Sequence, residues 1–121
     1  MSESQLFQTE EIRGVTVISL PDDYTSAYES SLPDLAGLLD LAATIEPARM
    51  AIDLQHVKYI GSAFIGFLIS LSSRLQERPN GRLALGEVSP FIQMALQKTR
   101  SDMLFEIHDS RDAAIDALAT Y

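Results

Sequence analysis

One serine stands at the point of the chain where a short polar crossing turns into a helix. Ser62 follows Gly61, and apolar residues then repeat at helical spacing: Phe64, Phe67, Leu68, Leu71 and Leu75. A hydroxyl at that point can accept from the free N–H groups of the first helical turn, so we predict Ser62 as the N-cap. The same hydroxyl could carry a phosphoryl group, whose charge suits the positive end of a helix dipole. A plain cap and a phosphorylation switch are therefore both open readings.

A nucleophilic serine is the other chemistry to weigh, with His56 as its base. A triad would need His56 within hydrogen-bond reach of Ser62. The Gly-x-Ser-x-Gly pattern of a nucleophile elbow is absent, because Ile60 and Phe64 occupy the glycine positions. The chain also has no cysteine, no phosphate-binding loop and no dinucleotide-binding glycine motif. We therefore expect a protein that is not an enzyme and has neither a metal site nor a cofactor.

Apolar periodicity predicts the elements that must position Ser62. Strands are expected over 5–11, 15–20, 49–54, 82–85 and 103–107, with a turn at Arg13-Gly14 and a polar loop over 24–31. Helices are expected over 31–45, 63–77, 90–99 and 110–118, with Ser89 and Ser110 as caps. This alternation predicts one α/β domain over residues 1–121, with a mostly parallel sheet of about five strands and about four helices.

Charge and hydropathy exclude several classes of function. The chain of 121 residues has 9 Lys and Arg against 17 Asp and Glu, a net charge of −8, so it should repel nucleic acid. No apolar run is long enough to cross a membrane, and the first residues do not resemble a signal peptide. We expect a cytoplasmic protein. The acidic balance is compatible with simple solubility or with a basic protein partner.

Two isoleucines flank the predicted buried face of the helix after Ser62. Ile65 and Ile69 lie beside that face on a helical wheel. Burial under a neighbouring helix is one possibility. The other is an exposed apolar edge next to Ser62, which would suit an interface.

An ordered set of motifs around Ser62 is similar to the STAS family of anti-sigma factor antagonists. The central motif reads Ile52-Asp53-Leu54-x-x-Val57-x-Tyr59-Ile60-x-Ser62-x-x-x-Gly66. Further segments resemble the later strands and helices of the family: Gly81-x-Leu83-x-Leu85, Val88-Ser89-Pro90, Leu104-Phe105-Glu106-Ile107 and Ser110-x-x-x-Ala114. The resemblance implies a single STAS domain that binds an anti-sigma factor serine kinase and is released when that kinase phosphorylates Ser62. Transcription would then be regulated indirectly.

The resemblance also implies a partner-binding surface around that serine. It would include Asp22 and Asp23 from the loop after the second strand, with these residues of the helix end: Gly61, Ser62, Ala63, Ile65, Gly66 and Ile69. Gly61, Ala63 and Phe64 depart from the family pattern, which usually has Asp, Ser or Thr, and Gly there. These departures favour the alternative of a non-switching STAS subunit in a signalling scaffold or in a lipid or anion transport assembly.

Overall fold

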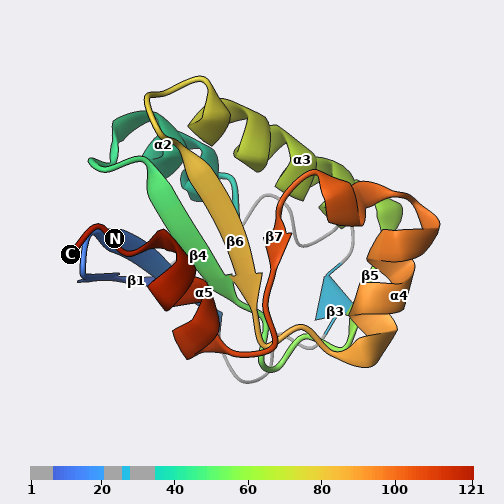
Figure 1. The fold of residues 1–121 in the computed structure, drawn as a ribbon. Coiled ribbons are helices and arrows are strands. Elements are labelled where there is room, and N and C mark those ends of the chain that lie inside the picture. Colours follow the sequence, from blue (N-terminus) through green and yellow to red (C-terminus); the bar gives the residue numbers. More distant parts are fainter. Residues whose placement is uncertain (1–6, 21–25, 28–34) are drawn as a thin grey trace.

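The computed structural model describes residues 7–20, 26–27 and 35–121. Asp22 and Asp23 lie outside the described residues, as does the predicted start of the first helix at Ser31 and Pro33. Figure 1 shows a central sheet with helices on both of its faces. The expected α/β architecture of a single domain is confirmed.

Five strands form the main sheet in the order β1-β2-β4-β6-β7. They are β1 (Gln8–Ile12), β2 (Val15–Ser19), β4 (Arg49–Asp53), β6 (Arg82–Gly86) and β7 (Glu106–Ile107). β1 pairs antiparallel with β2, and every later pairing is parallel. β4 lies between two parallel neighbours, as its nearly continuous apolar sequence predicts for a strand covered on both faces.

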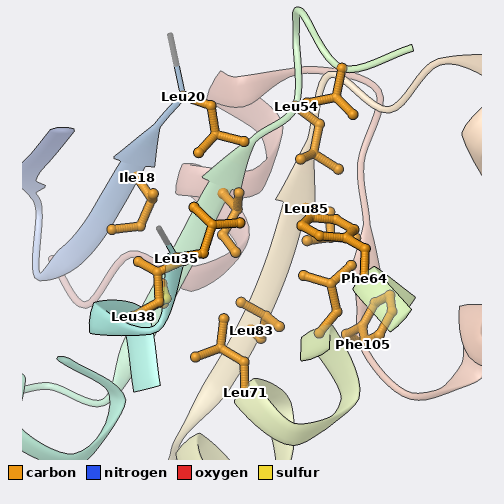
Figure 2. Close-up of a cluster of buried hydrophobic side chains, with 14 of the residues drawn as sticks. Ile18, Leu20, Leu35, Leu38, Leu54, Phe64, Leu71, Leu83, Leu85 and Phe105 are labelled. Carbon is orange, nitrogen blue, oxygen red and sulfur yellow. The ribbon is translucent and has the colours of Figure 1, made fainter. Parts of the chain in front are cut away.

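The two faces of the sheet carry side chains of different size, because successive residues of a strand point to opposite sides. Ile18, Met50 and Leu85 belong to the larger core, which also contains Phe64 and Leu71. Figure 2 shows several of these side chains between the strands and the helices of that face. On the other face lie Val15, Val17, Ala51 and Ala84, in a smaller cluster with side chains of the last helix. The alanines allow that helix to pack close to the sheet.

Four α-helices lie in the described part of the chain: α2 (Gly37–Thr44), α3 (Ser62–Gln76), α4 (Pro90–Lys98) and α5 (Arg111–Leu118). Two predicted caps are confirmed. The Ile92 N–H donates to Ser89 Oγ at 3.2 Å, and the Ala113 N–H donates to Ser110 Oγ at 3.0 Å. α2 and α3 pack against each other on the larger core, and α5 covers the opposite face (Figure 1).

Two local features differ from the sequence expectations. The strand predicted over 103–107 is reduced to β7, because Arg100 at φ 61° turns the chain and Ser101–Met103 forms a 3₁₀ helix, η2. A second, two-stranded parallel sheet joins β3 (Ser26–Ala27), within the predicted polar loop, to β5 (Tyr59–Ile60). Strands of two residues are too short to show the alternation on which strand prediction depends.

The predicted turn at Arg13-Gly14 is confirmed and is held by the end of the chain. Both residues have positive φ, 52° and 83°, which suits a tight hairpin. A Cβ on Gly14 would lie 2.1 Å from Thr120 Oγ1, so glycine is required there by space as well as by φ. The Thr120 N–H donates to the Arg13 carbonyl at 2.9 Å, which fixes the segment after α5 against the first hairpin.

Candidate functional site

Ser62 is the first residue of α3 and not its N-cap, which corrects the sequence expectation. Gly61 occupies the cap position in an extended conformation, with φ −105° and ψ 171°. Its carbonyl accepts from the Phe64 N–H at 3.1 Å and from the Ile65 N–H at 3.2 Å, and no side chain caps the helix. Helix start signals locate an N-terminus only to within a residue or two, and a glycine cap needs no side-chain acceptor.

The Ser62 hydroxyl is exposed and makes no side-chain hydrogen bond to any described residue, His56 included. It lies where the first backbone N–H groups of α3 have no partner within the helix. The first turn of α3 also holds no acidic residue. An anion attached here would meet the positive end of a helix of 15 residues without a carboxylate from that turn beside it.

Small and polar side chains continue from Ser62 along the exposed side of α3. Gly66, Ser70 and Ser73 are exposed, at spacings that keep them on one face of the helix. A Cβ on Gly66 would meet nothing within 4 Å. Nothing in the described structure therefore requires glycine at this position, although glycine inside a helix costs about 1 kcal/mol relative to alanine.

The two isoleucines beside this face are placed differently from each other. Ile65 is only 7% exposed and belongs to the larger core, so its burial is confirmed. Ile69 is half-buried and packs against the same core from its edge. Gly61 and Ala63 are also half-buried. The surface that a second molecule could reach at this helix end therefore consists mainly of Ser62 and Gly66, with the outer parts of Gly61, Ala63 and Ile69.

A polar network holds the crossing that leads from β4 to Ser62. The Gln55 N–H donates to Asp53 Oδ1 at 2.8 Å, and Arg111 Nη1 donates to Asp53 Oδ2 at 3.2 Å. Arg111 also donates to Ser19 Oγ and to Glu10 Oε1, both at 3.0 Å. The sequence pattern shows Asp53 at the end of a buried strand but does not identify Arg111 as its partner, because the two residues are distant in the chain.

A second ion pair links β6 with β7, the strand at the edge of the sheet. Arg82 Nε lies 2.6 Å from Glu106 Oε2, and Arg82 Nη2 lies 2.7 Å from Glu106 Oε1. These two hydrogen bonds hold the pKa of Glu106 below its ordinary value, although partial burial works in the opposite direction. They also raise the pKa of Arg82.

Residues 7–20, 26–27 and 35–121 contain neither a candidate metal site nor a candidate membrane span. No group of three or more His, Cys, Asp or Glu side chains is arranged to hold a metal ion there. None of the helices in these ranges is long and apolar enough to span a membrane.

The fold and the site together define a small α/β domain that presents an exposed serine at a helix N-terminus. The sequence model of the STAS domain matches residues 7–114, and the chain belongs to this family. Among curated protein sequences, no relative matches it.

Three solved structures illustrate the range of similar proteins. A STAS domain anti-sigma-factor antagonist protein from Planctomyces limnophilus has a TM-score of 0.84 and 29% identity, over 93% of this chain and 97% of that one. The Bacillus cell fate determinant SpoIIAA in its phosphorylated form has a TM-score of 0.64 and 18% identity, over 93% and 98%. A sulfate transporter family protein from Wolinella succinogenes has a TM-score of 0.72 and 18% identity, over 90% and 88%. The last two likenesses concern the fold alone.

Proposed function

We propose that this chain is an anti-sigma factor antagonist that works as a phosphoswitch in the cytoplasm. Unphosphorylated, it binds an anti-sigma factor serine kinase and so keeps that kinase from the sigma factor. Phosphorylation of Ser62 by the bound kinase releases it, and transcription is regulated indirectly. The proposal includes no enzymatic activity of its own.

One observation carries this proposal: Ser62 is exposed at the first residue of α3, and its hydroxyl makes no side-chain hydrogen bond to a described residue. A kinase can reach such an oxygen without local unfolding. The family supports the same reading, since similar proteins include an anti-sigma-factor antagonist domain and the phosphorylated form of SpoIIAA.

The physical basis of release is the charge that a phosphoryl group adds. It carries about −1.5 to −2 at neutral pH and three strong acceptor oxygens. The N-terminus of α3 can accommodate that charge in the free protein. A partner packed closely against Ser62 and Gly66 would instead have to bury it without compensation, which strongly disfavours the complex.

The proposed docking surface consists of Gly61, Ser62, Ala63, Gly66 and Ile69. Ile65 is left out of it because the side chain is in the core. Asp22 and Asp23 remain part of the proposal through the family resemblance alone, since they lie outside the described residues.

The test is reconstitution with the anti-sigma kinase encoded in the same genome and ATP. We expect one phosphoryl group by intact mass, located at Ser62 by fragmentation, and none in Ser62→Ala. Ser70→Ala and Ser73→Ala are matched controls, because they remove exposed hydroxyls from the same face of α3. Undiminished phosphorylation of Ser62→Ala would refute the assignment.

A second candidate is a non-switching STAS subunit of a signalling scaffold or of a lipid or anion transport assembly. The likeness to the Wolinella succinogenes sulfate transporter family protein favours it at the level of the fold, together with the departures at Gly61, Ala63 and Phe64. In that case Ser62→Asp would leave assembly with the partner intact. A loss of assembly in Ser62→Asp would instead favour the switch.

A further inference from the structure

An exposed apolar surface lies beside the Ser62 end of α3, on β5 and α4. The side chains of Tyr59, Phe91 and Met94 are 48%, 56% and 51% exposed. The rings of Tyr59 and Phe91 meet edge to face with centroids 5.5 Å apart, so the two elements form one continuous surface. Figure 1 shows α4 at the periphery of the molecule with β5 beside it. We call these three residues, with Lys58 and Lys98, the β5–α4 stripe.

The geometry of α4 explains why this surface faces outward. Phe91, Met94 and Lys98 are spaced to share one side of the helix, and Ile92 and Leu96 on the other side are fully buried. α4 is thus already anchored by its inner residues, and the side chains of Phe91 and Met94 remain about half exposed. An open groove of about 460 Å³ lies at the β5 end of the stripe, lined by Lys58, Tyr59, Ser89, Pro90 and Phe91.

Five of the nine cations of the chain make no ion pair with a described residue; three of them lie on or beside the stripe, and the other two, Arg49 and Arg74, lie elsewhere. Arg13, Arg78, Arg82 and Arg111 each pair with a carboxylate. Lys58 and Lys98 make no ion pair with described residues, and neither does Arg100 just beyond α4. A chain with a net charge of −8 therefore places, around its exposed aromatic surface, cations that pair with no carboxylate of the described residues.

We propose that the β5–α4 stripe is a docking surface for an acidic amphipathic helix of a protein partner. Apolar side chains of that helix enter the groove beside Tyr59 and Phe91, and its carboxylates face Lys58 and Lys98. α4 has nine residues and is about 14 Å long, enough to support two to three turns of a partner helix. This inference goes beyond the switch at Ser62 and does not depend on it.

Two other occupants fit this surface less well. A second copy docked through the same surface would bring the lysines of both copies to one interface with no carboxylate of the stripe to pair with them. A membrane surface has no projecting side chains to fill the groove beside Tyr59 and Phe91.

The experiment is a ¹⁵N–¹H NMR titration of the full chain with synthetic helical peptides. The probe has leucines on one face and glutamates on the other, and the matched peptide has lysine at every glutamate position. We expect saturable shifts centred on Tyr59, Phe91 and Met94 with the glutamate peptide only. Its affinity should fall about tenfold or more in Phe91→Ser and in the Lys58→Glu/Lys98→Glu pair. Arg74→Glu, which reverses an exposed cation in the last turn of α3, is the control and should change little.

Several outcomes would overturn the inference. These are no binding of the glutamate peptide, equal binding of the lysine peptide, or shifts that avoid the stripe. Flotation with phosphatidylglycerol vesicles that depends on Phe91 would assign the surface to lipid. A dimer in sedimentation velocity that is lost in Phe91→Ser would assign it to a second copy. Peptide binding should be unchanged in Ser62→Asp. The outcome of the peptide titration is therefore independent of whether Ser62 is a phosphoswitch.

Discussion

Two polar regions of this domain, the cluster around Arg111 and the end of α3 at Ser62, are built in opposite ways. Arg111 contacts Ser19, Asp53 and Glu10 through its guanidinium group, and its backbone N–H donates to Glu87 Oε2 at 2.8 Å. Ser62 has no side-chain partner among the described residues, and Gly66 after it fills no internal space. Saturated hydrogen bonding holds a fold together, whereas unused hydrogen-bonding capacity on a rigid helix is available to another molecule.

The largest effect on stability is expected from the loss of the Arg111 side chain, which holds the hydrogen-bonded cluster together. Arg111→Ala leaves the carboxylate of Asp53 unpaired, with its side chain only 10% exposed. The free energy of unfolding should fall by about 2–3 kcal/mol in urea denaturation. Asp53→Asn keeps the acceptor for the Gln55 N–H and removes the charge. The double variant with Arg111→Ala should therefore lose less stability than the sum of the losses in the two single variants. Strict additivity would show that the pair is not coupled.

The substitution Ser62→Asp should weaken binding of the partner and leave the stability of the fold nearly unchanged. A negative side chain at the first residue of α3 is compatible with the helix dipole, so unfolding should change by less than about 0.5 kcal/mol. Affinity for the kinase partner should fall by about 2 kcal/mol, roughly thirtyfold, in titration calorimetry. Ser73→Asp, three turns further along the same exposed face, is the control and should bind nearly as the wild type does. Equal affinity of Ser62→Asp and wild type would contradict the switch.

Gly66→Ala should separate stability from function within one substitution. The added methyl group meets nothing within 4 Å and favours the helix, so the protein should gain about 0.5–1 kcal/mol of stability. If a partner packs closely against this face, the same methyl group should weaken the complex. Thermal unfolding and partner titration on one sample provide both values. A stabilised variant that binds as tightly as the wild type would show that no close approach occurs at Gly66.

The smallest effect concerns Glu106, which pairs with Arg82 at the edge of the sheet. Its folded-state pKa lies below the unfolded value because of the hydrogen bonds from Arg82. Its contribution to stability is therefore present above the unfolded pKa and is lost as the pH falls through the folded pKa. Both side chains are about one third exposed, so the effect should stay below about 1 kcal/mol. Glu106→Gln should flatten the pH dependence of urea unfolding in that acidic range.

His108→Gln is the matched control for this titration. The His108 Nε2 lies 3.6 Å from Glu106 Oε1, and the substitution keeps the Arg82–Glu106 pair. The acid dependence should persist in His108→Gln. If it disappears there and remains in Glu106→Gln, the assignment to Glu106 is wrong.

Local signals in the sequence predict most of the fold. Ser89-Pro90 and Ser110 mark helix starts because cap chemistry acts over three residues, and both predictions are confirmed. Arg13-Gly14 predicts the turn because glycine readily adopts the positive φ that a tight turn needs, which is again a local property of the sequence. β3 and β5 could not be foreseen, because a pairing of two residues leaves no periodicity.

The site was predictable in part. The helix after Ser62 follows from the spacing of its apolar residues, and the exposed face of Gly66, Ser70 and Ser73 follows from the same period. The cap position was wrong by one residue. The network around Arg111 and the stripe on β5 and α4 join residues from different elements, so a single sequence without tertiary contacts does not reveal them.

The order of elements has a consequence for synthesis of the chain on the ribosome. Val15, Val17, Ala51 and Ala84 form one face of the sheet, and the residues that cover it, Ala114, Ile115 and Leu118, belong to α5. During translation this face stays open to water until the last helix has left the exit tunnel. A chain interrupted before Arg111 would keep a bare β-surface, and such surfaces promote aggregation. A copy that lacks α5 therefore exposes to solvent the apolar face that α5 covers in the folded domain.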